Sequence, residues 1–133
     1  MTLLRFFIIG CATMALCAAA EPRMLRCASQ IEAANLANVY AAALNAEVHF
    51  TNGTPSMVPA IPARRVAVLV KRMPFEEIAR DDIALRVDGL CHRALVKREE
   101  AWITKGDNNP ARDLALLTSA NFLGIVVMIL DYP

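Results

Sequence analysis

Three kinds of side chain in this sequence could together perform nucleophilic chemistry. Ser56 stands between two prolines, which stiffen the backbone and would present the hydroxyl at a fixed geometry, as a nucleophile requires. His92 is of the residue type that can take up a serine proton near neutral pH. Asp107 or Asp113 could supply the carboxylate that fixes the tautomer of such a base. Each residue alone also has an ordinary explanation, as a turn serine, a structural histidine or a loop aspartate.

The segments around these residues predict a mainly β fold. Ser56 falls in a turn-rich stretch over 51–62, and both aspartates fall in a polar loop over 105–113. Short apolar or alternating segments predict strands at 65–70, 83–87, 91–97, 101–104 and 124–130. Because no helical pattern separates these strands, we expect a small, mainly antiparallel β-sheet or barrel. His92 then lies on the third of the strands.

An amphipathic helix is predicted before the sheet, over residues 27–48. Its larger apolar side chains recur at four-residue spacing, as Leu36, Tyr40 and Leu44, and we expect this stripe to pack on the domain. Ser29 and Glu32, three residues apart, resemble a capping box at the start of the helix. Residues 21–50 are thus expected to form a helical N-terminal segment.

The first twenty residues predict export. Arg5 is followed by an apolar run that ends in the small residues Ala18 and Ala20, a pattern typical of a signal peptide cleaved after Ala20. The run is also nearly long enough for an uncleaved membrane anchor, which would associate the chain with a membrane through residues 1–20. In either case the remaining domain lies outside the cytoplasm, as a periplasmic, secreted or membrane-anchored protein.

Composition limits the partners of the domain. The 133 residues allow one domain, and a hydrophobic fraction of 56% excludes a disordered chain. A net charge of +1 lacks the basic excess of a nucleic-acid-binding surface, so no nucleic acid is expected as a partner.

Two cysteines lie outside the predicted export segment, and the sequence is compatible with two states for them. Cys27 and Cys91 could form a disulfide in an exported protein, or they could be two small buried thiols. The sequence has no Cys-x-x-Cys pair and only two histidines. It therefore predicts no metal site and no cofactor.

Three motifs in order carry a family resemblance. Ser-Met-Val-Pro at 56–59 precedes His-Arg at 92–93, and Lys-Gly-Asp-Asn-Asn follows at 105–109. Over about residues 51–130 the chain resembles the signal-peptidase-like serine peptidases. The histidine at this point of the order is similar to the endoplasmic-reticulum and archaeal branch, whereas the bacterial branch and the self-cleaving repressors carry a lysine.

The resemblance implies a role for each candidate residue. Ser56 would be the nucleophile and His92 the base, with Asp113 orienting the base and Asp107 as the alternative or supporting carboxylate. Thr54 lies two residues before Ser56, where a hydroxyl in related enzymes helps the serine backbone N–H to hold the oxyanion. Thr54 could equally be an ordinary loop threonine.

The function implied is that of an exported serine endopeptidase of the signal-peptidase type. Its partner would be a protein or peptide substrate, cut after small residues by a peptidase domain over 51–133. Two departures from the family pattern favour an alternative. Pro55 removes a backbone donor next to the serine, and Asp81 replaces a glycine of the family's Gly-Asp-Ile element. The alternative is an inactive fold of the same type that serves as a binding or assembly module of the cell envelope.

Overall fold

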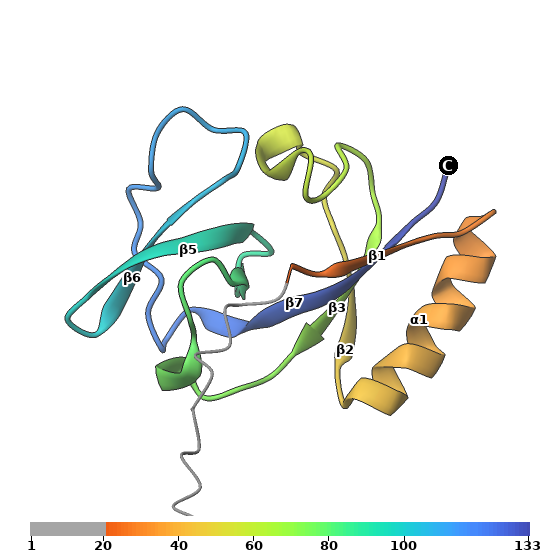
Figure 1. Ribbon diagram of the computed structural model, residues 1–133, viewed down its shortest axis with the longest axis horizontal. Helices are drawn as coiled ribbons and strands as arrows, with labels where there is room; N and C mark the ends of the chain where they lie inside the picture. Colours follow the sequence, from red (N-terminus) through yellow and green to blue (C-terminus); the bar gives the residue numbers. More distant parts are fainter. Residues whose placement is uncertain (1–20) are drawn as a thin grey trace, which may run out of the picture.

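The computed structural model describes residues 21–133 and forms one seven-stranded sheet with one α-helix (Figure 1). The mainly β prediction is therefore confirmed. The strands are β1 Arg23–Arg26, β2 Glu47–Phe50, β3 Ala67–Lys71, β4 Ile83–Arg86, β5 Cys91–Arg98, β6 Ala101–Lys105 and β7 Phe122–Asp131. The predicted signal or anchor lies outside the described residues. Within 21–133, no helix has both the length and the apolar character needed to cross a bilayer.

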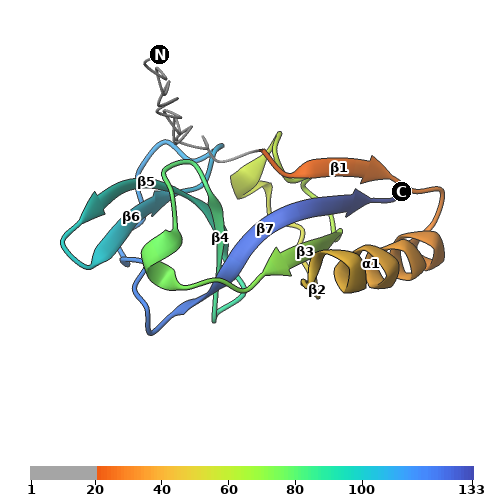
Figure 2. The same cartoon turned by 60° about the horizontal axis from the view of Figure 1, so that its bottom comes forward.

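The long strand β7 organises the sheet. The strand order is β2-β3-β7-β4-β5-β6, with β1 paired to β7 in addition. Residues 125–130 of β7 pair with β3, residues 122–125 pair with β4, and residues 128–131 pair with β1. All of these pairs are antiparallel except that of β1, which runs parallel to β7 (Figure 2). One strand thus connects the N-terminal part of the chain to the part that carries the candidate residues.

The helix α1 spans Gln30–Leu44 and begins where the sequence predicts. Ser29 is its N-cap, and the Ser29 hydroxyl accepts a hydrogen bond of 3.2 Å from the Glu32 N–H. The helix ends earlier than expected because Asn45 adopts a left-handed conformation with φ 51°, and the chain then enters β2. The sequence analysis missed β1 and β2, since each has only four residues and the first two residues of β2 fall within the predicted helix.

The face of α1 that contacts the sheet is not the predicted stripe. Tyr40 is 36% exposed and Leu44 39% exposed, and only Leu36 is partly buried. The buried side chains are instead the alanines, Ala33, Ala37 and Ala41. They pack against Ala67 and Leu69 of β3 and against Met128 and Leu130 of β7. Small side chains let the helix approach the sheet closely, and close packing then decides which face turns inward.

The opposite face of β3 is covered by the segment between β2 and β3. Val66, Val68 and Val70 pack there with Met57 and Ile61. The core therefore fixes the short 3₁₀ turn η1, Pro55–Met57, which carries Ser56. A second 3₁₀ turn, η2, spans Phe75–Glu77.

The alanine interface of α1 gives a stability prediction. Ala37 has no exposed area, so Ala37→Leu should lower the free energy of unfolding by about 1–3 kcal/mol through overpacking. Urea denaturation measures this change. The control is Ala42→Leu at an exposed position of the same helix, which should change stability by less than about 0.5 kcal/mol. Equal effects of the two variants would contradict the close packing.

Candidate active site

Ser56 lies at the surface end of a turn that is anchored in the core. Met57, the next residue, is 3% exposed, and the Met57 carbonyl accepts a hydrogen bond of 3.0 Å from the N–H of buried Ile61. Thr54 is the N-cap of η1, but its side chain does not cap the turn. The Thr54 hydroxyl lies instead 3.3 Å from Ser56 Oγ. The first N–H groups of such a turn have no partner within it, so the Ser56 N–H is available alongside the Thr54 hydroxyl.

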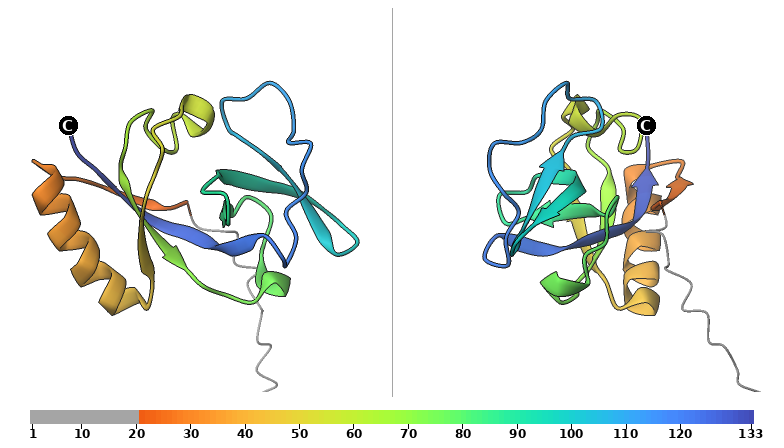
Figure 3. Two further views of the ribbon diagram at one scale, coloured as in Figure 1. Left: turned by 180° about the vertical axis from the view of Figure 1, so that it is seen from behind. Right: turned by 60° about the vertical axis from the view of Figure 1, so that its left-hand side comes forward.

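The loop after β6 holds this turn from the other side. The Asn108 backbone N–H donates to the Ser56 carbonyl at 2.8 Å, and Asn108 Nδ2 donates to the Pro55 carbonyl at 3.2 Å. A Cβ on Gly106 would stand 2.6 Å from the Ser56 carbonyl oxygen, so the close approach requires glycine there. Figure 3 shows, from behind, the two segments meeting at one edge of the molecule.

His92 and Asp113 form a hydrogen-bonded pair in which the histidine is buried and the aspartate partly buried. His92 lies on β5 and is 4% exposed, and its Nδ1 is 2.6 Å from Asp113 Oδ2. Thr104 of β6 donates its hydroxyl to the same carboxylate oxygen at 2.6 Å, and the Asp113 N–H donates to the Thr104 carbonyl at 2.8 Å. An ionised carboxylate only accepts hydrogen bonds, so Nδ1 is the donor, and in the neutral ring the lone pair then lies on Nε2.

Sequence reasoning missed Thr104 as the residue that positions Asp113. Thr104 is two residues after Trp102 on β6, and both side chains are buried. Residues two apart on a strand share a face, so a threonine on the inward face could have been read as a buried hydrogen-bond donor.

Asp107 contacts Arg93 and not His92. Arg93 Nε donates to Asp107 Oδ1 at 2.8 Å, and Arg93 Nη2 donates to Oδ2 at 2.7 Å. The same guanidinium reaches the Glu21 carboxylate and the Asp81 carbonyl. The hydrogen bonds that Arg93 donates to Asp107 raise the pKa of its guanidinium, burial opposes this, and the hydrogen bonds donated to Glu21 add to the increase. Arg93 therefore connects Asp107 to Glu21, the first described residue.

Ser56 and His92 come from neighbouring elements but are not hydrogen-bonded. The turn η1 packs beside β5. Within residues 21–133, the hydrogen bond of Ser56 Oγ is with Thr54, and His92 Nε2 is buried without a partner. The structure thus joins histidine to aspartate and serine to threonine, and leaves the serine-to-histidine link unmade.

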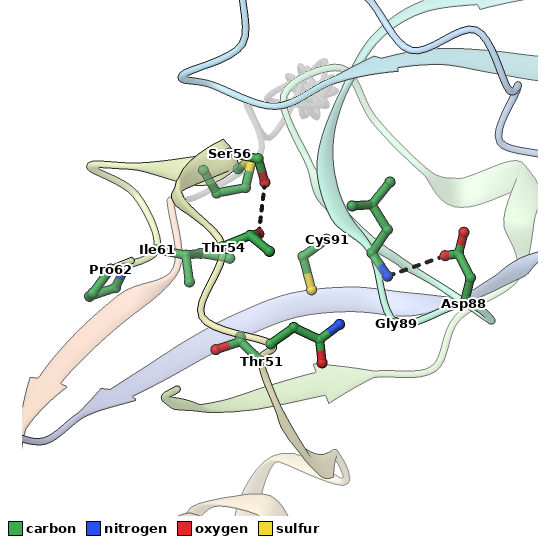
Figure 4. A pocket seen from close by; sticks show the side chains of 11 residues that line it. Thr51, Thr54, Ser56, Ile61, Pro62, Asp88, Gly89 and Cys91 are labelled. Carbon is green, nitrogen blue, oxygen red and sulfur yellow. Dashed lines mark hydrogen bonds between the residues drawn. The ribbon is translucent and has the colours of Figure 1, made fainter. Parts of the chain in front are cut away.

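A pocket opens beside Ser56 (Figure 4). It has a volume of about 200 Å³. Thr54 and Ser56 lie on one side of it, and the turn between β4 and β5 lies on the other, with Cys91 between them. Met57 and Ile61 add apolar surface to its wall.

The two departures from the family pattern have local explanations. Asp81 has φ 75°, the left-handed conformation that favours glycine and that aspartate tolerates better than most residues. Asp82 closes the same turn by accepting a hydrogen bond of 2.8 Å from the Ala79 N–H. Burial raises the pKa of the Asp82 carboxyl. Pro55 occupies the first position of η1, where a missing N–H leaves no bond of the turn unmade.

Comparisons of the chain with models of protein families, with curated proteins and with solved structures find no match in any of the three. The family resemblance read from the sequence therefore stays a prediction.

Cys27 and Cys91 are two free, buried thiols and do not form a disulfide. The sequence allowed either a disulfide or two buried thiols, and the structure contains the two buried thiols. Cys27 packs under α1, whereas Cys91 belongs to the core cluster around Met57. The two thiols are thus on opposite faces of the sheet.

Thiol labelling tests this arrangement. Burial raises the pKa of the Cys91 thiol to about 11, so at pH 8 the thiol stays neutral and the native protein should resist iodoacetamide there. In urea, without reductant, both Cys27 and Cys91 should become labelled, as read by peptide mass mapping. A cross-linked Cys27–Cys91 peptide in a non-reducing digest would contradict the prediction.

Proposed function

We propose that this protein is an exported serine endopeptidase of the signal-peptidase type, which cleaves precursor proteins or peptides after small residues. The observation that carries the proposal is the partly buried hydrogen bond between His92 Nδ1 and Asp113 Oδ2. It leaves His92 Nε2 buried and unpartnered within the described chain, beside the turn that carries Ser56. A buried nitrogen lone pair is costly unless a proton donor reaches it, and a serine hydroxyl is such a donor.

The proposed reaction is acyl transfer through Ser56. Ser56 Oγ attacks the peptide carbonyl carbon while His92 Nε2 takes the hydroxyl proton. The resulting imidazolium is stabilised by Asp113 across Nδ1. His92 then gives the proton to the leaving amine as the peptide C–N bond breaks and the acyl group stays on Ser56. Water, deprotonated by the same nitrogen, attacks this ester, and His92 returns the proton to Ser56 Oγ as the acid is released.

The oxyanion would be held by the Ser56 N–H and the Thr54 hydroxyl. The 3.3 Å separation between Thr54 Oγ1 and Ser56 Oγ supports this role, because a donor so close to the nucleophile is within reach of the carbonyl oxygen of the group that Ser56 attacks. Rotation of the Ser56 side chain from Thr54 toward His92 Nε2 would complete the site. Catalytic hydrogen bonds are often incomplete before substrate binds.

Asp107 is assigned a supporting role. Its two hydrogen bonds to Arg93 hold the loop whose next residue, Asn108, fixes the Ser56 carbonyl. Asp113 is six residues further along the same loop and contacts the base directly. Asp107 thus helps to position the serine, and Asp113 orients the histidine.

The alternative is an inactive fold that binds a partner in the envelope. One observation favours it: the Ser56 hydroxyl is paired with Thr54 and not with the histidine. An inactive module would need neither a hydroxyl at residue 56 nor a carboxylate at residue 113, so substitution of these two residues separates the two functions.

Ser56→Ala tests the proposal directly. The protein is incubated with precursor peptides that carry small residues before the cut, and the products are followed by mass spectrometry. We expect the wild-type protein to cleave and the variant to lose kcat by roughly 10⁶-fold. Ser119→Ala, at an exposed turn serine, is the matched control and should cleave normally. Equal cleavage by all three proteins, or by none, would refute the peptidase assignment.

Substitution of the two aspartates tests their separate roles. Asp113→Asn should reduce kcat by about 10⁴-fold, because an amide can hold the histidine in the wrong tautomer. Asp107→Asn should reduce kcat less and mainly lower the melting temperature, since it weakens the Arg93 contact. Initial rates and thermal denaturation of both variants measure this. A larger kcat loss in Asp107→Asn would reverse the assignment.

A further inference from the structure

The side chain of Arg93 joins three segments that are distant in the sequence. It is 12% exposed, and each of its five N–H groups has an acceptor. Two N–H groups are donated to Asp107 in the loop after β6, and one is donated to the Asp81 carbonyl before β4. The remaining two are donated to Glu21, which is 72 residues away in the sequence. The guanidinium is thus held along its whole outer edge.

Glu21 binds the part of the guanidinium that Asp107 leaves free. Arg93 Nη1 donates to Glu21 Oε1 at 2.5 Å, and Nη2 donates to Oε2 at 3.3 Å. The two oxygens of one carboxylate therefore face the two nitrogens of the fork, an arrangement that fixes direction as well as distance. The Glu21 side chain is 66% exposed, so we expect this ion pair to add little to the free energy of unfolding.

The backbone holds Glu21 at this position independently of the ion pair. Pro22 follows directly, which restricts Glu21 to an extended conformation. The strand β1 begins at Arg23, which pairs with Met128 of β7. Figure 1 shows the start of β1 pointing toward the half of the sheet that carries β5. Because little chain entropy is lost when the carboxylate binds, even an exposed glutamate can fix the guanidinium.

Arg93 transmits this constraint to the turn that carries Ser56. Asp107 accepts two of the Arg93 hydrogen bonds, and its own backbone N–H donates to Met57 Sδ at 3.4 Å. The backbone N–H of the next residue, Asn108, donates to the Ser56 carbonyl at 2.8 Å. A displacement of the guanidinium would therefore shift the two loop residues that contact the serine turn.

We propose that Glu21 is a positioning residue of the candidate active site, which acts on Ser56 through Arg93 and Asp107. This inference rests on the proposed peptidase function. Glu21 touches no reacting group, and its role is to keep the loop after β6 where the serine turn needs it. A cut after Ala20, as the sequence predicts, would leave Glu21 in the mature domain. The first residue after the export segment would then be part of the support of the site.

Glu21→Gln in the full-length protein tests this role. A glutamine oxygen can accept from one nitrogen of Arg93, but its amide N–H groups then face the other nitrogen. With the peptide substrates described above, we expect kcat to fall by about three- to fivefold with KM unchanged, because the serine is displaced while the substrate contacts remain. The melting temperature should stay the same, which separates positioning from a loss of stability. Glu100→Gln, at an exposed position of the turn between β5 and β6, is the control and should leave kcat unchanged.

Two further measurements show whether the effect passes through the loop. In an Asp107→Asn background, Glu21→Gln should cause no further loss of kcat, because residues in one hydrogen-bond network are not additive. Hydrogen exchange, read by mass spectrometry, should be faster in residues 106–109 of Glu21→Gln than in the wild-type protein. Unchanged exchange in these residues would overturn the proposal, as would an unchanged kcat or an equal loss of kcat in both backgrounds.

The positioning role and the peptidase assignment can fail separately. If the wild-type protein and Glu21→Gln cleave at the same rate, the peptidase stands and the positioning role is wrong. If no protein cleaves any peptide, the peptidase assignment is wrong, and the exchange of residues 106–109 alone decides whether Glu21 positions the serine turn.

Discussion

The partly buried hydrogen bond between His92 and Asp113 is the interaction on which the site depends. It joins a strand, β5, to a loop that begins after β6, and the Thr104 hydroxyl of β6 donates to the same carboxylate oxygen. Because His92 is buried, the polar atoms of its ring need partners. Within residues 21–133, His92 Nε2 is the ring nitrogen without one, and β5, which carries it, packs beside the turn of Ser56.

The loop after β6 contacts the side chains of two neighbouring residues of β5. His92 and Arg93 are adjacent on the strand, so their side chains point to opposite faces. The loop supplies one carboxylate to each side chain: Asp113 hydrogen-bonds the histidine, and Asp107 hydrogen-bonds the arginine. Between these two attachments, Asn108 hydrogen-bonds the serine turn. The relative positions of Ser56, His92 and Asp113 thus depend on one loop, whose own shape is fixed by its contacts with β5.

The pattern of the sequence was sufficient to predict the mainly β fold, the positions of five strands and the start of the helix. Alternation of apolar residues and the Ser29 cap are local signals, and local structure follows them. The stripe of Leu36 and Tyr40 misled because spacing tells only that residues share a face. Which face turns inward was decided by how closely α1 can approach β3, and the alanines allow the shorter distance.

The sequence by itself determined the residue types of the site and their order: a rigid serine turn, a histidine on a strand and two aspartates in one loop. Only the tertiary structure decided which aspartate meets the histidine. Both lie in the same polar loop, so their spacing cannot separate them. The choice depends on where β5 presents its two faces and on Thr104, a residue from another strand. Contacts between residues far apart in the chain arise from packing, and no local pattern encodes them.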